Sequence, residues 1–321
     1  MAEVANSRKL KRSLPAEAPR TEMPRGSGFD CLCDQVVVVT GGGRGIGQVL
    51  ANSLADAGAV VAVAGRSAAD LAKTVREISA RGGRAESVIL DVADRDAVAA
   101  GIQQVQRAYG RIDLLINNAG LLGPIADLWE ADPGEWWRTM EVHIGGTFLC
   151  SRAVLPGMIS RGRGRIINVV SHAGVFRWPT CSAYSVSKAA VVKLTENLAV
   201  ELRRHGVAVF AFHPGLTPIG LSEKAIGMRA DPGSAKSRAI AWVRAEAESD
   251  RAVSPDRVAD FVLALAKGQG DDLSGRYLTV FDDLGALAAR AKDIRAADAL
   301  TLRVREFNCE DEPDGTGTRE L

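Results

Sequence analysis

Tyr184 and Lys188 are four residues apart in the segment SAYSVSK, and the residues that follow have the apolar periodicity of a helix. Residues with this spacing lie on one helix face, so the phenol and the ammonium group can point at the same ligand. A free phenol has a pKa of about 10 and exchanges protons poorly at neutral pH, whereas a neighbouring cation lowers that pKa. We therefore predict that Tyr184 is a general acid/base activated by Lys188.

Ser171 is a candidate partner of Tyr184, because it stands at the end of the run RIINVV, which is typical of a strand. A hydroxyl at a strand end can donate a hydrogen bond to a reacting oxygen and polarise a carbonyl. The chain has only 3 tyrosines, so few other phenols compete for this role. Tyr109 precedes a Gly-Arg turn and Tyr277 lies in a predicted strand, and we expect both to pack.

The elements that position these residues alternate, from Gln35 onward, between short β-branched runs and helical patterns. The runs are apolar throughout, as expected for strands with helices on both faces. The sequence predicts an α/β fold: a single doubly wound Rossmann domain with a central parallel sheet of about seven strands and helices on both faces. The predicted strands are Val36–Val39, Val60–Ala64, Glu86–Asp91, Leu114–Asn117, Arg165–Val170, Val207–Phe212 and Arg276–Val280.

The segment TGGGRGIG directly follows the first predicted strand and leads into a helix. Glycines there allow a tight turn and let backbone amides approach a pyrophosphate at the helix N-terminus. In this strand-turn-helix context the segment predicts a dinucleotide site, although its spacing differs from GxGxxG. The residues predicted to bind the cofactor there are Thr40, Gly41, Gly43, Arg44, Gly45, Ile46 and Gly47.

Cofactor choice depends on the end of the second predicted strand, where an acidic residue favours NAD by hydrogen bonding the adenosine ribose. Gly65 takes that position here, Arg66 follows it, and Arg44 lies in the glycine turn. Two guanidinium groups without a competing carboxylate favour the 2'-phosphate of NADP, so we expect NADP(H) to be favoured over NAD(H). The alternative is that both arginines are solvated or pack over the adenine.

Two further strand ends carry candidate cofactor residues, because open parallel sheets bind ligands at the carboxyl ends of their strands. Asp91 and Val92 end the third predicted strand, and Asn118, Ala119 and Gly120 end the fourth in the segment NNAG. We predict contacts with adenine and ribose, although Asp and Asn also cap strand ends.

Taken together, these segments resemble the classical short-chain dehydrogenase/reductase family, over roughly Asp34 to Val280. The matching features are TGGGRGIG, NNAG, HPG at residues 213–215, and the set of Ser171, Tyr184 and Lys188. The resemblance implies that Tyr184 is the acid/base, that Lys188 also holds the nicotinamide ribose, and that Ser171 orients the substrate oxygen.

The same resemblance assigns supporting roles around the cofactor. Asn118 and Gly120 would support it, and Pro214 and Gly215 would line the nicotinamide pocket. Thr217 comes sooner after the Pro-Gly pair than the family's usual threonine, and we predict that it contacts the carboxamide.

His143 departs from the family pattern, since the segment EVHIGGTF has histidine where the family usually has an asparagine that completes a proton relay through water. An imidazole can also bond a backbone carbonyl and a water, so we include His143 among the predicted catalytic residues. The alternative is a helix histidine with only a structural role.

Residues 31–282 are predicted to form the Rossmann domain, preceded by a disordered N-terminal arm over residues 1–30. A substrate lid is expected at about residues 216–254, where apolar side chains alternate with Gly, Pro and charged residues. A helical extension beginning near Asp282 over residues 283–308, and a flexible tail over residues 309–321, complete the chain.

The composition of the chain argues against some kinds of binding partner. The 321-residue chain has 40 Lys and Arg against 39 Asp and Glu, which argues against a nucleic-acid or anionic-membrane binder. No apolar run approaches the roughly 18 residues that span a bilayer, and no signal peptide is seen. The five cysteines are scattered and suggest neither a disulfide framework nor a metal site, so we expect a cytoplasmic location.

The sequence therefore predicts an NADP(H)-dependent oxidoreductase that interconverts a ketone and a secondary alcohol by hydride transfer. We expect a small-molecule carbonyl or alcohol substrate and a homodimer or homotetramer built through the helices containing Phe148–Ile159 and Ala189–Arg203. Two alternatives are an NAD-dependent alcohol dehydrogenase of the same family and a non-catalytic regulator that senses the nucleotide. A sugar-nucleotide epimerase or dehydratase is disfavoured, because its glycine turn usually has the pattern TGxxGxxG.

Overall fold

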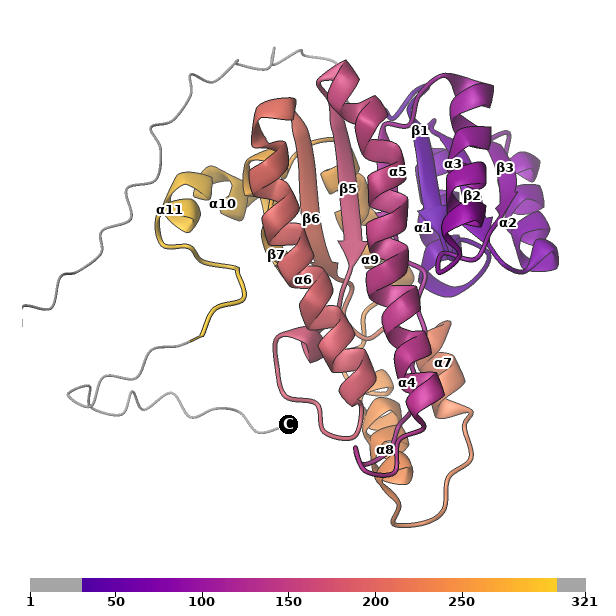
Figure 1. Cartoon of the computed structure of the whole chain (residues 1–321), viewed down its shortest axis with the longest axis vertical. Helices are drawn as coiled ribbons and strands as arrows, with labels where there is room; N and C mark the ends of the chain where they lie inside the picture. Colours follow the sequence, from indigo (N-terminus) through magenta and orange to yellow (C-terminus); the bar gives the residue numbers. More distant parts are fainter. Residues whose placement is uncertain (1–30, 305–321) are drawn as a thin grey trace, which may run out of the picture.

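The computed structural model describes residues 31–304, which form a parallel sheet covered by helices on both faces (Figure 1). The sheet has seven strands in the order β3-β2-β1-β4-β5-β6-β7, which confirms the predicted α/β fold. The predicted arm over residues 1–30 and the predicted tail over residues 309–321 lie outside the described residues. The strands are β1 Val36–Thr40, β2 Val60–Gly65, β3 Arg84–Ile89, β4 Leu114–Asn117, β5 Gly164–Val169, β6 Val207–His213 and β7 Tyr277–Thr279.

Each face of the sheet has its own apolar core, and alternate residues of β1 enter one or the other. Val37 and Val39 pack with α1, α2 and α9, whereas Val36 and Val38 pack with α3 and α5. The helices are α1 Gly45–Asp56, α2 Ala68–Ala80, α3 Arg95–Tyr109, α4 Pro133–Met140, α5 Gly146–Arg161, α6 Ser182–Leu202, α7 Leu221–Ile226, α8 Ala235–Ala247, α9 Pro255–Ala266, α10 Leu284–Ala289 and α11 Ala291–Ala296.

The third strand begins and ends earlier than predicted. β3 pairs with β2 from Arg84 to Ile89, so Asp91 lies beyond the strand rather than in it. The prediction followed apolar residues, but β3 is an edge strand whose side chains are mostly only partly buried, and its first residue is an exposed arginine.

A single long helix runs from Pro133 to Arg161, formed by α4, a π-helical turn at Glu141–Gly145 and α5. Within residues 31–304 it is the one helix long and apolar enough to cross a membrane, with a mean hydropathy of 1.2, although no such segment was expected. Cys150, Val154 and Met158 from this helix are buried in the core beneath the sheet. Packing in the core therefore accounts for part of its apolar composition, whereas other apolar side chains of the helix, such as Phe148, are exposed.

The C-terminal extension is not one helix from Asp282, because α10 and α11 each have six residues and are separated at Arg290. Leu284 and Ala291 are both buried, so the break lets both helices pack on the core. The chain then passes along β7, where the Tyr277 N–H donates to the Leu300 carbonyl at 2.8 Å. Arg303 binds the Glu196 carboxylate of α6 at 2.6 Å.

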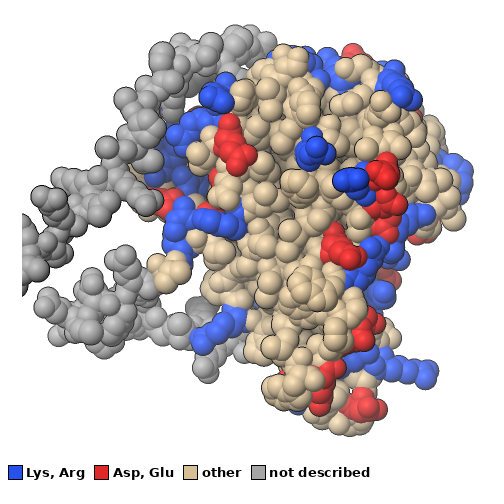
Figure 2. Space-filling model, in the orientation of Figure 1, with Lys and Arg blue, Asp and Glu red and all other residues tan. Residues whose placement is uncertain are grey.

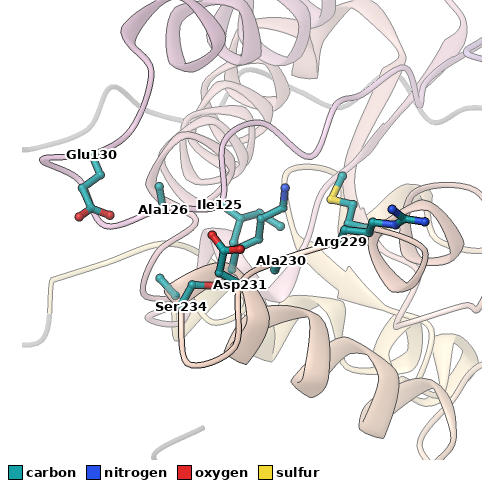
Figure 3. Close-up of a pocket in the computed structure, with 10 residues that line it drawn as sticks. Ile125, Ala126, Glu130, Arg229, Ala230, Asp231 and Ser234 are labelled. Carbon is teal, nitrogen blue, oxygen red and sulfur yellow. The ribbon is translucent and has the colours of Figure 1, made fainter.

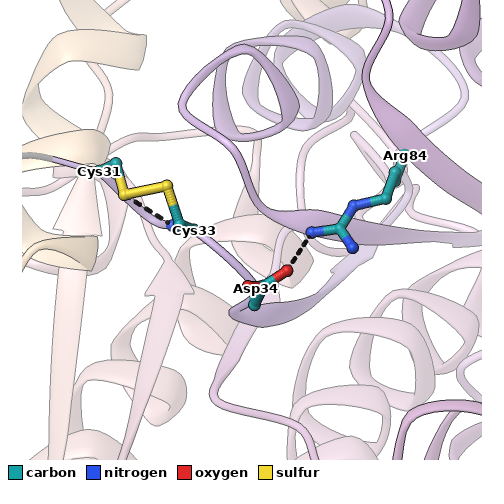
Figure 4. Close-up of a disulfide and its surroundings, with 4 residues drawn as sticks. All are labelled: Cys31, Cys33, Asp34 and Arg84. Atoms are coloured by element: carbon teal, nitrogen blue, oxygen red, sulfur yellow. Dashed lines mark hydrogen bonds and ion pairs between the residues drawn. A yellow bond between two sulfur atoms is a disulfide. The ribbon is translucent and has the colours of Figure 1, made fainter.

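Cys31 and Cys33 form a disulfide with their Cα atoms 5.2 Å apart (Figure 4), whereas the sequence suggested no disulfide framework. Because the two residues are only two positions apart, the bridge closes a very short loop and removes little chain entropy. Cys150 and Cys181 are free and buried. The cysteines therefore no longer support the argument for a reducing compartment.

Candidate active site

Ser171, Tyr184 and Lys188 are brought together where β5 ends and α6 begins. Ser171 caps the short turn after β5, its Oγ accepting a hydrogen bond from the Ala173 N–H at 3.2 Å. Tyr184 lies in the first turn of α6, with its phenol close to the Ser171 hydroxyl. Lys188 is one helical turn further, with its Nζ 5.6 Å from the centre of the Tyr184 ring. Two hydroxyls and an ammonium group therefore share one site.

The ionisation of this site differs from the prediction that Lys188 lowers the pKa of Tyr184. Desolvation raises the pKa of Tyr184 to about 12, with the hydrogen bond to Ser171 acting in the opposite direction. Burial also lowers the pKa of Lys188 to about 8. The Lys188 ammonium donates to the Val169 carbonyl at 2.8 Å rather than to the phenol, so desolvation of the phenol dominates.

His143 lies in the π-helical turn with its ring edge-to-face against Tyr184, the ring centres 5.5 Å apart. Its Nε2 accepts a hydrogen bond from the Leu121 N–H at 2.9 Å, so a neutral ring carries its proton on Nδ1. Nδ1 is 2.7 Å from the Ser187 Oγ, which in turn donates to the Tyr184 carbonyl at 2.8 Å. Burial, followed by the charge of Lys188, lowers the pKa of His143 well below its ordinary value.

Both nitrogens of His143 are thus occupied by protein groups, in place of the predicted backbone carbonyl and water. The histidine links the segment after β4 to the first turn of α6. Ser187, which receives this hydrogen bond, was missed by the sequence analysis, although its position three residues after Tyr184 places it close to the same turn.

The glycine turn between β1 and α1 is held by the NNAG segment after β4. Thr40 Oγ1 accepts hydrogen bonds from the N–H groups of Asn118 and Ala119 at 3.0 and 3.1 Å. The Asn118 side-chain amide donates to the carbonyls of Thr40 and Gly41 at 2.9 and 3.3 Å. At Gly47 a Cβ would lie 2.2 Å from the Gly41 carbonyl oxygen, so no other residue fits there. Thr40 and Asn118 therefore stabilise the glycine turn by tying it to the segment after β4.

Two features of this region fit a nicotinamide dinucleotide. α1 begins without a side-chain cap and without an acidic residue in its first turn, which leaves its N-terminus available to a pyrophosphate. Thr217 Oγ1 is buried and has no hydrogen-bond partner within residues 31–304, and it follows the turn of Pro214 and Gly215. A carboxamide is a suitable partner for such a hydroxyl.

Arg66 has a carboxylate beside it, contrary to the expectation from the sequence. Its Nη1 is 3.9 Å from Asp91 Oδ2, and Arg138 of α4 also hydrogen-bonds to Asp91. Burial acts to raise the pKa of Asp91, but the Ala93 N–H and the two arginines outweigh it and lower that pKa. No sequence pattern predicted this contact with Arg138, which lies 47 positions from Asp91. Arg44 and Arg66 are both exposed.

The remaining predicted cofactor residues pack around these groups. Val92 is buried and touches Gly146 of α5, where a Cβ would lie 2.7 Å from it. Gly120 lies against His143, because a Cβ at this position would be only 3.0 Å from the His143 Nε2. Ile46 and Ala119 are partly buried against the two cores.

A pocket of about 750 Å³ lies between the segment after β4 and the segment that leads into α8 (Figure 3). Ile125 and Met228 are apolar residues of its lining, and none of the predicted catalytic residues lines it. Its four charged residues balance: Glu130 and Asp231 against Arg229 and Lys236.

Comparisons with known proteins agree on one family. A family model described as short chain dehydrogenase matches residues 35–227. The chain is 34% identical over 276 residues to the short chain dehydrogenase mpl6 of Monascus purpureus, covering 84% of this chain and 88% of that protein. A variant of actinorhodin polyketide ketoreductase solved with NADPH matches with a TM-score of 0.71 and 30% identity, over 78% of this chain and 97% of that one. An NAD+-bound xylitol dehydrogenase matches with a TM-score of 0.70 and 28% identity, over 76% of this chain and 96% of that one.

Proposed function

Since the chain belongs to the short-chain dehydrogenase/reductase family and is an NAD(P)-dependent oxidoreductase, we propose that it interconverts a ketone and a secondary alcohol with Tyr184 as general acid/base. The placement of Ser171 at the end of β5, beside Tyr184 and Lys188 of α6, carries this proposal. Two neighbouring hydroxyls can both bond one substrate oxygen, and Lys188 adds a positive charge 5.6 Å from the phenol ring.

In the direction of reduction, Ser171 donates a hydrogen bond to the carbonyl oxygen and polarises it. Tyr184 gives its phenolic proton to the same oxygen, and a nicotinamide cofactor, when bound, would supply the hydride to the carbonyl carbon. A pKa of about 12 keeps the phenol protonated at neutral pH, so Tyr184 holds the proton that reduction requires, but it also makes the phenol a weaker acid. The charge of Lys188 stabilises the phenolate that proton transfer leaves behind.

We propose His143 as a positioning residue for this step. Its ring supports the Tyr184 ring edge-on and ties the Leu121 N–H to Ser187, whose hydroxyl bonds the carbonyl of Tyr184 itself. Holding the first turn of α6 in this way would fix the direction of the phenol.

NADP(H) is proposed as the favoured cofactor, with exposed Arg44 and Arg66 beside the open N-terminus of α1 as support. The second candidate is an NAD-dependent alcohol dehydrogenase, and the contact between Asp91 and Arg66 favours it, because that carboxylate competes with a 2'-phosphate for the guanidinium group.

Residues 216–254, which contain α7 and α8, are proposed as the substrate lid of the domain spanning residues 31–282. The support is a close contact at the glycine turn, where a Cβ on Gly45 would lie 2.9 Å from the Gly220 Cα. This segment therefore reaches the predicted pyrophosphate site.

A homodimer or homotetramer is proposed through α5 and α6. The face over these helices is largely free of charged side chains (Figure 2). Phe148 of α5 and Val200 of α6 are 51% and 65% exposed, so each of the two helices has apolar surface that a second copy could cover. A cytoplasmic location remains a prediction.

Tyr184→Phe tests the function. We expect turnover to fall at least about 1,000-fold, because the proton donor is lost, while cofactor binding is retained. Nicotinamide absorbance with a panel of ketones measures the first effect, and fluorescence titration of NADPH measures the second. Tyr109→Phe, at an exposed tyrosine remote from the site, is the matched control. Full activity of the Tyr184 variant would overturn the mechanism.

A further inference from the structure

Two tryptophans from separate segments stand beside the proposed proton donor. Trp178 lies in the loop before α6, and its ring packs edge-to-face on Tyr184, with centres 5.8 Å apart and planes at 86°. Trp242 comes from α8 and packs against Trp178, with centres 5.5 Å apart. The two indoles are both half-buried, so part of each surface is open.

The indole N–H groups distinguish this pair from a tryptophan that only packs. Trp136, which is also half-buried, donates from Nε1 to Ser182 Oγ at 3.1 Å. Trp178 and Trp242 make no such hydrogen bond to any residue in the range 31–304. Their polar edges are therefore available to a ligand.

The surroundings of Tyr184 determine where a substrate can lie. His143 contacts one side of the phenol ring, and the Lys188 ammonium lies 5.6 Å from its centre. Trp178 packs on the same ring, edge-to-face. A carbonyl whose oxygen bonds Ser171 and Tyr184 has its two substituents on the adjacent carbon, so a ring directed toward Trp178 would contact that indole.

The pocket of Figure 3 borders the two segments that carry this pair, although neither tryptophan lines it. The Ala126 N–H, at its edge, donates to the Thr180 carbonyl at 2.9 Å, which joins the pocket to the loop that carries Trp178. Lys236 of its lining belongs to α8, the helix that carries Trp242.

We propose that Trp178 and Trp242 form an aromatic subsite, and that the substrates of this enzyme are ketones whose carbonyl carries an aryl ring. The ring enters from the pocket and packs against the two indoles, by offset stacking or edge-to-face contact. The charged residues at the far end of the pocket accommodate polar substituents on the ring. This inference rests on the proposed ketone reduction and adds the substrate class.

Acetophenone and cyclohexyl methyl ketone provide the test, because they have the same carbon skeleton and differ in whether the ring is flat and aromatic. We expect the enzyme with NADPH to have a higher kcat/KM for acetophenone. Trp178→Leu and Trp242→Leu should each lower that value about tenfold, and leave cyclohexyl methyl ketone within about twofold. Trp178→Phe, which keeps an aromatic ring, should recover most of the preference.

Trp137→Leu is the matched control, because Trp137 is 64% exposed and packs on Trp136 rather than on Tyr184. It should leave both ketones unchanged. Equal losses for both ketones in the Trp178 and Trp242 variants would overturn the subsite and leave these residues a structural role.

A binding measurement separates this inference from the proposed function. Saturation-transfer NMR in the Tyr184→Phe background detects acetophenone without turnover, and we expect its signal to be lost when Trp178→Leu is added. If the wild-type protein reduces no ketone, the proposed function fails, yet this signal still decides whether the subsite exists. An unchanged signal in the double variant would reject it.

Discussion

The cofactor side of the sheet keeps its charged groups at the surface, whereas the catalytic side removes its ionisable groups from water. Arg44 and Arg66 are exposed near the glycine turn, where backbone and amide hydrogen bonds supply the rigidity. His143 and Lys188 are buried, and Tyr184 is half-buried beside them. In all three, desolvation shifts the pKa so that the neutral form is favoured.

This difference implies that the two sides respond to different solution conditions. Exposed charges are screened by salt within about 10 Å at 0.1 M ionic strength, so cofactor affinity should depend on salt. Buried groups are screened much less and respond to pH instead. The following changes test that division.

Lys188→Met is expected to have the largest effect, lowering kcat for ketone reduction about 100-fold, because the phenolate loses its neighbouring charge. In the wild type, activity should fall above a pH of about 8, where Lys188 loses its proton. Lys188→Arg keeps a charge at all these pH values, so its activity should fall only at higher pH. A pH–rate profile checks all three proteins, and an unshifted profile for the arginine variant would contradict the assignment.

The same methionine variant should be more stable than the wild type. The pKa of Lys188 is lowered from 10.5 to about 8 on folding, so at pH 7 its charged form costs up to about 3 kcal/mol. Between pH 8 and 10.5 the unfolded chain holds a proton that the folded chain has released, so wild-type stability rises with pH there. Urea unfolding at pH 7 and pH 9 measures both effects.

Arg66→Ala examines the cofactor side. We expect KM for NADPH to rise about tenfold and KM for NADH to change less than about twofold, since only the 2'-phosphate loses a partner. The wild-type preference for NADPH should also shrink as salt is raised from 0.05 to about 0.5 M. Arg107→Ala, at an exposed arginine of α3, is the control. A wild-type preference for NADH would contradict the proposed use of NADP(H) and favour an NAD-dependent alcohol dehydrogenase.

His143→Asn should have the smallest effect on rate, lowering kcat about threefold, because Tyr184 is less firmly held. Its effect on stability depends on acidity. The folded pKa of His143 lies well below the ordinary value of 6.5, so below about pH 6.5 only the unfolded chain takes up the proton and stability falls. The stability of the variant should therefore fall less on acidification than that of the wild type. Some of the fall should remain, because burial also lowers the pKa of His213, to about 3. Unfolding at pH 5 and pH 7 in both proteins checks this, and identical declines would exclude His143 as a cause.

The sheet was predictable because each strand is a short apolar run with its own local pattern. β4 matches its predicted limits, and the other apolar strands differ by one or two residues at their ends. The set of Ser171, Tyr184 and Lys188 was predictable for a similar reason, since strand ends and helix spacing bring them to one place.

The contacts that could not be predicted all join loops or helices distant in the sequence. Arg138 reaches Asp91, His143 reaches Leu121, and Trp242 reaches Trp178 only after the chain has folded. No period or motif relates the members of such pairs. The predicted direction of the Tyr184 pKa shift was wrong for the same reason. The sequence shows the neighbouring lysine, but it does not show the loss of water around the phenol.

The segment that passes along β7 also affects how the molecule meets other chains. A strand at the edge of a sheet presents unpaired N–H and C=O groups that can template the addition of a foreign strand. The Leu300 carbonyl occupies the Tyr277 N–H on that edge, and the Glu196–Arg303 ion pair fastens the segment in place. The opposite edge, β3, instead begins with the charged Arg84. The C-terminal segment thus hinders the addition of a foreign strand at β7, and the charge of Arg84 hinders it at β3.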